Sequence, residues 1–254
     1  MTIVGGVIAV LVVIGVVVAF TRGDDTDETA SDDTTSTTAA TGESTTTTSA
    51  APAAELPAPL PGITLTADTE CPPAEGAEER VQKFAGPPPE CIDPDATYTA
   101  TFSTSEGDFT ATLDAQAAPE TVNNFVVLAR YRYYDGVPFH RIVPGFVIQA
   151  GDGDGEPWGN NDLGYSIADE LPADSSAYSD YALAMANSGP DTNGSQFFVV
   201  LPGGGAQLQP LYSLFGQVTE GTEVVDTIAT YADGQTPTKA VLINSIAITE
   251  TPAG

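Results

Sequence analysis

The chain has 254 residues, of which 35 are acidic and 7 basic, so its formal net charge at pH 7 is -28. Phosphate binding needs clustered Lys and Arg, so this charge argues against a nucleic-acid partner. Two cysteines and one histidine exclude a disulfide-dense scaffold, a four-cysteine zinc site and most histidine-based metal centres. A hydrophobic content of 41% excludes a wholly disordered protein.

Residues 1–22 are predicted to be a transmembrane anchor or a signal segment. Positions 3–20 carry no charge and consist mostly of Val and Ile. As a helix this run would span about 27 Å, close to the thickness of the bilayer core. An uncleaved anchor fits this length, whereas a cleaved signal fits the small residues at 17–19. The only nearby base, Arg22, follows the segment, so the distribution of basic residues does not decide its orientation.

Residues 23–62 are predicted to be a disordered linker rich in Thr, Ser, Asp and Pro. Positions 24–55 contain 15 Ser or Thr and 8 acidic residues, with no base and no aromatic. Such a stretch buries too little apolar surface to offset the entropy lost on ordering, and its like charges repel one another. The prolines between 51 and 61 continue this tether in a stiffer, extended form.

Residues 63–96 form an extension that contains both cysteines, Cys71 and Cys91. A disulfide between them would stabilise the segment by about 3 kcal/mol, and two unpaired thiols are the alternative. A disulfide that follows a membrane segment places the rest of the chain outside the cytoplasm. We therefore expect a single-pass cell-membrane protein whose folded domain is extracytoplasmic, or a secreted protein if the first segment is cleaved.

Residues 97–252 are predicted to be the folded domain. Alternating apolar and polar residues indicate short strands, and apolar residues three and four apart indicate two helices. The many short strands and Gly-rich turns favour a mostly β fold, a closed antiparallel barrel capped by helices. The expected strands are 98–103, 108–113, 137–141, 146–151, 181–187, 196–200, 213–218 and 240–249, and the expected helices are 119–131 and 223–231.

Two runs concentrate polar side chains beside apolar strands. Residues 139–152 read FHRIVPGFVIQAGD, with a turn at Pro144-Gly145, and residues 185–198 read MANSGPDTNGSQFF. An arginine flanked by apolar residues, as Arg141 is, is costly to bury unless its charge is used or paired. The acidic residues from Asp152 onward hint at a calcium loop. They lack the Gly and the acid that such a loop needs at its sixth and twelfth positions, so a solvated turn is predicted, with Trp158 as its anchor.

These two runs resemble the cyclophilin family of peptidyl-prolyl isomerases. The pattern F-H-R-x-x-P-G-F-x-x-Q-x-G-D, followed about 33 residues later by M-A-N-x-G-P-x-T-N-G-S-Q-F-F, is long and specific. The likeness covers residues 97–250 and says nothing about residues 1–96. It implies a closed eight-stranded antiparallel β-barrel capped by two α-helices.

The resemblance also assigns site residues. It implies catalytic roles for Arg141, Gln149 and Phe146. Where the family often has Met the chain has Val147, and the segment before Phe215 lacks the tryptophan and histidine of many members, with Tyr212 near the histidine position. The substrate-binding residues implied by the resemblance are His140, Val147, Ala186, Asn187, Gln196, Phe198, Leu208 and Tyr212.

The expected chemistry is rotation about the X-Pro bond, which amide resonance opposes with a barrier of about 18–20 kcal/mol. A guanidinium that donates to the prolyl nitrogen would stabilise the twisted state more than the planar one. We expect no covalent intermediate, metal or cofactor. The expected partners are unfolded or Pro-containing polypeptides and, through the N-terminal segment, the membrane, without nucleic acid or an obligate oligomer. A non-catalytic Pro-peptide-binding chaperone and a structural envelope protein are the alternatives.

Overall fold

The computed structural model describes residues 52–155, 157–160 and 162–253. The expected N-terminal membrane or signal segment and positions 23–51 of the expected linker lie outside these residues. Within the described part of the chain, no helix is both long and apolar enough to cross a membrane.

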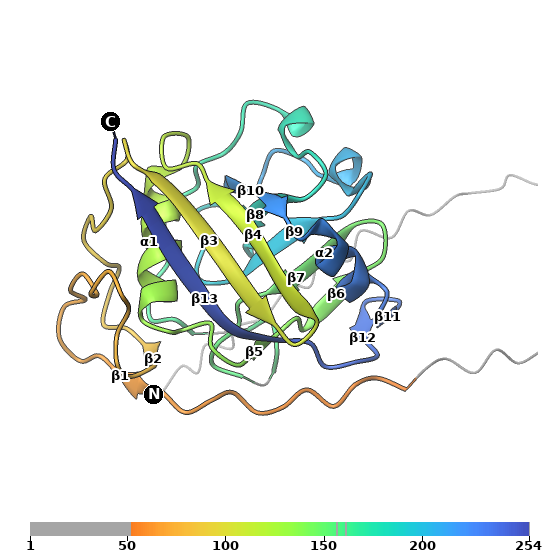
Figure 1. Ribbon diagram of the computed structural model, residues 1–254, viewed down its shortest axis with the longest axis horizontal. Coiled ribbons are helices and arrows are strands. Elements are labelled where there is room, and N and C mark those ends of the chain that lie inside the picture. Colours follow the sequence, from red (N-terminus) through yellow and green to blue (C-terminus); the bar gives the residue numbers. More distant parts are fainter. Residues whose placement is uncertain (1–51, 156, 161, 254) are drawn as a thin grey trace, which may run out of the picture. The chain divides into compact units, whose positions relative to one another are not determined.

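One nine-stranded antiparallel sheet dominates the structure, with strand order β5-β13-β3-β4-β10-β8-β9-β7-β6 (Figure 1). Strands β3 and β4 pair directly as the hairpin expected from the alternating pattern, with Phe102 opposite Phe109. The strand bounds are β3 Thr97–Thr104, β4 Gly107–Leu113, β5 Val137–Pro138, β6 Arg141–Val143, β7 Val147–Ala150, β8 Ala182–Met185, β9 Phe197–Val200, β10 Leu214–Glu220 and β13 Leu242–Thr251.

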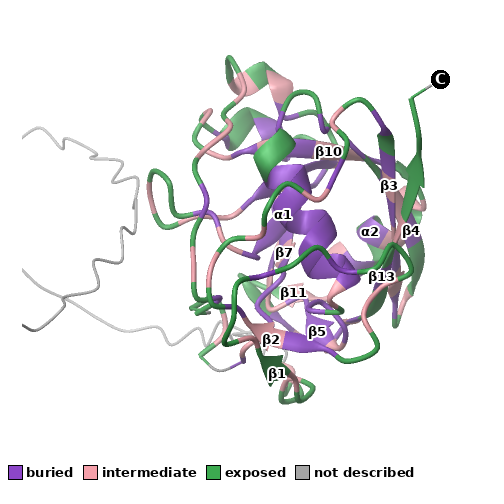
Figure 2. Ribbon diagram, turned by 90° about the vertical axis from the view of Figure 1, so that its left-hand side faces the viewer, coloured by how far each residue is buried: buried purple, intermediate pink, exposed green. Residues whose placement is uncertain are grey.

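Two α-helices accompany the sheet, α1 (Pro119–Arg130) and α2 (Thr222–Ala229), as the apolar spacing predicts. A proline begins α1, where its missing N–H costs no hydrogen bond. The carboxylate of Glu170 accepts from the next two backbone N–H groups, at 3.0 and 2.7 Å. Nearly all of α1 is buried (Figure 2). At its centre the ring of Phe125 packs against those of Phe197 and Phe215 in the core.

The sheet is not the closed eight-stranded barrel that was expected, although the mostly β class and the two helices are confirmed. Its end strands, β5 and β6, do not pair with each other anywhere in the described chain. Pro138 in β5 has no N–H to donate. In β6 the N–H of Ile142 donates instead to the carbonyl of Gln235, at 3.3 Å. Gln235 lies between two short strands that the sequence did not predict, β11 (Ala232–Asp233) and β12 (Thr236–Pro237).

The extension at 63–96 packs on this domain and contains a two-stranded parallel sheet, β1 (Ile63–Thr64) with β2 (Val81–Lys83). Its Val81 and Phe84 are buried in the same core as the strands. The predicted disulfide between Cys71 and Cys91 is present. Two 3-10 turns, at Ser175–Ala177 and Gly204–Gln207, complete the described secondary structure.

Candidate functional site

Three neighbouring strands bring a row of side chains onto one face of the sheet. Arg141 in β6 lies opposite Gln149 in β7, and Gln149 lies opposite Phe198 in β9. Directly paired residues of antiparallel strands point to the same side. The register therefore joins the arginine and glutamine of the first sequence run to the phenylalanine of the second.

The turn between β6 and β7 shapes one end of this row. Pro144 supplies a fixed φ and Gly145 adopts a φ of 67°, which is the residue pattern of a type II turn. The turn closes through a hydrogen bond from the N–H of Phe146 to the carbonyl of Val143, at 3.0 Å. The carbonyl of Phe146 then accepts from the N–H of Leu201, at 2.9 Å, which ties the turn to the end of β9.

A cavity of about 230 Å³ opens along this row, and we call it the proline groove. It is lined by nine of the eleven predicted site residues, including Ala186 and Asn187 from the second sequence run. Leu208 and Tyr212 are among them, although their segment departs from the family pattern. The lining residues are Arg141, Phe146, Val147, Gln149, Ala186, Asn187, Phe198, Leu208 and Tyr212.

Aromatic rings form one wall of the proline groove. The rings of Phe198 and Tyr212 meet edge to face, with centroids 5.4 Å apart. The hydroxyl of Tyr178 donates to the carbonyl of Tyr212 at 2.7 Å and accepts from its N–H at 3.1 Å. Tyr178 thereby holds the backbone of Tyr212 in place. No sequence pattern points to this tyrosine, because the two residues are 34 positions apart.

A chain of amide side chains holds Arg141 at the edge of the groove. Its Nη1 donates to Oε1 of Gln149 at 3.3 Å, and its Nε donates to Oε1 of Gln235 at 2.9 Å. Gln149 in turn donates from Nε2 to Oε1 of Gln196, at 2.9 Å. Gln196 therefore acts on the groove through Gln149 and does not line it. Asn187 donates from its side chain to the carbonyl of Leu211 at 2.8 Å.

No carboxylate of the described residues pairs with the charge of Arg141. None of the ion pairs among the described residues involves this arginine. Burial lowers its pKa from the usual arginine value, and the nearby Tyr212 acts in the opposite direction. Arginine stays protonated even when it is partly buried, so a half-buried positive charge faces the groove.

His140 is not among the residues that line the groove, in contrast to its predicted role in substrate binding. Successive side chains in an extended segment point to opposite faces, so His140 and Arg141 separate. The imidazole stacks on Trp158, with ring centroids 6.5 Å apart and planes within 14°. Burial, and secondarily the charge of Arg141, lowers the pKa of His140 to about 4, while the interaction with Gln196 raises it. His140 is therefore neutral at neutral pH.

A second cavity, of about 170 Å³, adjoins the proline groove and shares Gln149, Ala186 and Asn187 with it. Its other side is formed by Gly159, Asn160 and Leu163 of the loop at 152–164, whose acidic first residues were predicted to be a solvated turn. That interpretation is wrong, because Asp152 is fully buried and accepts from the N–H groups of Gly159, at 2.6 Å, and Asp154, at 3.3 Å. Burial raises the pKa of Asp152, and these backbone donors oppose the rise.

Gln235 is the contact to Arg141 that sequence reasoning missed. It is the second residue of the two-residue turn between β11 and β12, and the first, Gly234, adopts a φ of 65°, so this glycine is the local signal for the turn. The turn alone does not indicate that its glutamine reaches an arginine 94 positions earlier.

Residues 99–248 match the model of the family described as cyclophilin type peptidyl-prolyl cis-trans isomerase/CLD. The chain belongs to the cyclophilin family. Because this match covers more than half of the chain and contains the whole proline groove, it confirms the resemblance carried by the two sequence runs. This cyclophilin is accordingly a peptidyl-prolyl isomerase.

Curated relatives and solved structures agree with the family match. A probable peptidyl-prolyl cis-trans isomerase A of Mycobacterium leprae is 41% identical over 169 residues, which are 59% of this cyclophilin and 91% of the relative. Peptidyl-prolyl cis-trans isomerase A of Mycobacterium tuberculosis is also 41% identical, over 61% of this chain and 94% of its own. A Cryptosporidium parvum cyclophilin structure has a TM-score of 0.55 and 30% identity, covering 61% and 99% of the two chains.

Proposed function

We propose that this cyclophilin accelerates X-Pro rotation in client proteins outside the cytoplasm, with Arg141 as its catalytic group. The observation that carries the proposal is a positive charge, fixed by two amide oxygens, at the edge of a groove of about 230 Å³ that has both apolar and polar side chains in its lining. A related Cryptosporidium parvum cyclophilin was solved in the presence of the dipeptide Ala-Pro, with a TM-score of 0.53 and 30% identity to this chain. The groove of the present chain is proposed to take such a proline.

The mechanism follows from the electronic change during rotation. In the planar amide the nitrogen lone pair is delocalised, whereas in the twisted state it is localised and accepts a hydrogen bond. A guanidinium N–H of Arg141 aimed at that nitrogen stabilises the twisted state selectively, which is what lowers a barrier. The partial burial of Arg141 strengthens the interaction, because less water screens it.

The remaining groove residues hold the peptide while one side of the bond turns. Phe146, Val147, Phe198 and Leu208 supply apolar surface for the prolyl ring. Gln149 is proposed to orient Arg141 and to contact the peptide. Ala186, Asn187 and Tyr212 line the same groove, where backbone and ring groups can hold the residues flanking the proline, and Gln196 supports Gln149 from behind.

The proposed extracytoplasmic location is supported by the disulfide and by the uncharged run at 3–20. Disulfides persist in oxidising compartments and are rare in the cytosol. The chain is anchored in the membrane by its first segment, or secreted if that segment is removed. Intact mass of the mature protein, measured with and without reduction, tests both points. A full-length mass with two free thiols in protein isolated under alkylating conditions would overturn the proposed location.

The catalytic proposal is tested with a short X-Pro peptide and three full-chain variants, Arg141→Met, Arg141→Lys and, as a control for net charge, Lys239→Met. Loss of a transition-state donor predicts a fall in kcat of about 100-fold to 1000-fold for Arg141→Met, with a smaller change in KM. Lys239 pairs with Glu106 away from the groove, so Lys239→Met should match the wild type. If the kcat of Arg141→Met equals that of the wild type, the proposed mechanism is wrong. A wild type that binds Pro peptides without turnover would instead favour the chaperone alternative.

A further inference from the structure

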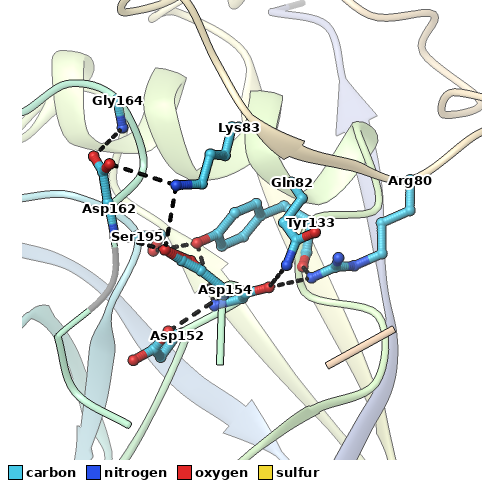
Figure 3. Close-up of polar contacts among 10 residues, drawn as sticks. Arg80, Gln82, Lys83, Tyr133, Asp152, Asp154, Asp162, Gly164 and Ser195 are labelled. Carbon is cyan, nitrogen blue, oxygen red and sulfur yellow. Dashed lines mark hydrogen bonds and ion pairs between the residues drawn. The ribbon is translucent and has the colours of Figure 1, made fainter. Parts of the chain in front are cut away.

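Three side chains of the extension at 63–96 contact the loop at 152–164 (Figure 3): Arg80, Gln82 and Lys83. Arg80 is buried, and its guanidinium donates to three backbone carbonyls, those of Leu60 at 2.7 Å, Tyr133 at 2.8 Å and Gly153 at 2.8 Å. Gln82 adds a second donor to the carbonyl of Gly153, at 3.1 Å. A buried guanidinium that binds carbonyls from three separate segments fixes their spacing, because leaving its donors unpaired is costly.

Lys83 forms ion pairs with two other residues of the same loop. Its ammonium lies 3.9 Å from a carboxylate oxygen of Asp154 and 3.4 Å from one of Asp162. The carboxylate of Asp154 also accepts from the N–H of Asp162, at 2.9 Å, and that of Asp162 from the N–H of Gly164, at 3.2 Å. Without the ammonium between them the two carboxylates would repel each other. Lys83 therefore joins the two ends of the loop.

The opposite side of the loop forms part of the second cavity. Gly159, Asn160 and Leu163 line that cavity together with Gln149 and Asn187 of the proline groove. The extension also reaches this part of the loop directly, since the N–H of Phe84 donates to the carbonyl of Leu163 at 3.2 Å. A shift of the loop at Gly153 or Asp162 would move the wall of the second cavity.

The loop has little structure of its own to hold this position. It contains no helix or strand among its described residues and includes several glycines. Asp152 connects its two parts by accepting from the N–H of Gly159. Further support comes from the domain, through the hydrogen bond from the N–H of Gly153 to the hydroxyl of Tyr133 at 3.2 Å and the stacking of Trp158 on His140, and from the extension. Residues 80 and 83 of the extension precede the family match, which begins at residue 99.

We propose that Arg80 and Lys83 are positioning residues that set the selectivity of this cyclophilin for a side chain near the substrate proline. This inference rests on the proposed function. The second cavity is lined by uncharged polar groups, which favour an uncharged polar side chain such as Gln over Ala. Those polar lining groups include the side chains of Asn160, Ser166, Ser188, Thr192 and Gln196.

The test uses the full chain and a peptide set in which Gln replaces Ala at one position within three residues of the proline. The readout is the ratio of kcat/KM for each Gln peptide to that for the all-Ala peptide. Lys83→Met removes the partly exposed ion pairs. It should lower the largest of these kcat/KM ratios about threefold, mainly by raising the KM for that Gln peptide. Lys83→Arg keeps the charge and should restore the ratio. Arg80→Met should lower it at least as much, and the control Lys239→Met should leave it unchanged.

Equal ratios in the wild type, Lys83→Met and Arg80→Met would overturn the inference while leaving the proposed function intact. Because Arg80 is buried, near-UV circular dichroism checks that its variant is folded, and Lys83, with a side chain 44% exposed, is the safer substitution. If the wild type binds the peptides but turns over none, the proposed function fails, and the same ratio is then measured from dissociation constants. A wild type that shows neither turnover nor binding overturns both.

Discussion

The guanidinium Nε of Arg141 lies 2.9 Å from the side-chain oxygen of Gln235, a residue 94 positions further along the chain. With Gln149 on the other side, the arginine is oriented by two neutral amide oxygens. A carboxylate in either place would cancel the charge that the groove presents. This arrangement keeps Arg141 both fixed and charged in a chain whose net charge is -28.

Gln235→Met should lower kcat by about tenfold, because one charge-assisted hydrogen bond that orients Arg141 is lost. Gln235→Glu should lower kcat further, since its carboxylate would pair with the guanidinium and reduce the charge facing the substrate. A stopped-flow isomerisation assay measures both variants. Gln217→Met is the control, because Gln217 donates to the carbonyl of Asp180 outside the groove. Wild-type kcat in both Gln235 variants would show that Gln149 alone orients the arginine.

His140 should make the folded state less stable in mild acid. Its pKa is about 4 in the folded protein and near 6.5 when exposed, so between these values the unfolded chain binds more protons. The free energy of unfolding should therefore fall by about 2 kcal/mol from pH 7 to pH 5. Urea titrations of the wild type and of His140→Gln measure this slope. The variant has no titrating imidazole, and an equally steep slope in it would assign the effect to other groups.

The disulfide should stabilise the extension and, through it, the whole domain. Both of its ends are tied to the α1 region: the N–H of Cys91 donates to Asn123 at 2.7 Å, and the hydroxyl of Tyr131 donates to the carbonyl of Glu70 at 2.9 Å. Replacing both cysteines with alanine should lower the free energy of unfolding by about 3 kcal/mol, the loop-entropy value. Chemical denaturation measures it. Equal stability of oxidised wild type and double variant would contradict the estimate.

Tyr178→Phe should weaken substrate binding more than it slows rotation. The change removes the hydroxyl that holds the backbone of Tyr212, leaving a carbonyl and an N–H without that partner. A loss of about 1 kcal/mol in the free energy of unfolding is expected, with KM rising more than kcat falls. Tyr181→Phe is the matched control, because that hydroxyl contacts Asp226 away from the groove. An unchanged KM in Tyr178→Phe would mean that the Tyr212 wall does not contact the peptide.

The acidic surface should favour clients that carry basic residues. A net charge of -28 attracts Lys-bearing and repels Glu-bearing Pro peptides over distances set by the ionic strength. The screening length is about 30 Å at 0.01 M salt and about 3 Å at 1 M, so the preference in kcat/KM should largely vanish at high salt. A preference that does not change with salt would have to come from short-range contacts.

Local patterns predicted the parts of the fold that local physics controls. The hairpin of β3 and β4 followed from strict alternation, and α1 followed from its initial proline and its apolar spacing. The prediction of a closed barrel was wrong, because closure depends on contacts between residues far apart in the chain. Whether β5 and β6 pair depends on what covers their free edges, and the backbone of Gln235 covers that of Ile142.

The sequence by itself determined the family, the acidic character and most of the groove. Two long runs carry nearly all the side chains of the site, and a hairpin with a Pro-Gly turn is enough to place Arg141 opposite Gln149. Only the tertiary structure decided that Gln235 orients Arg141, that Tyr178 supports Tyr212, and that Arg80 and Lys83 grip the loop beside the groove. Each of these contacts joins segments far apart in the chain, where no periodicity or spacing relates one residue to the other.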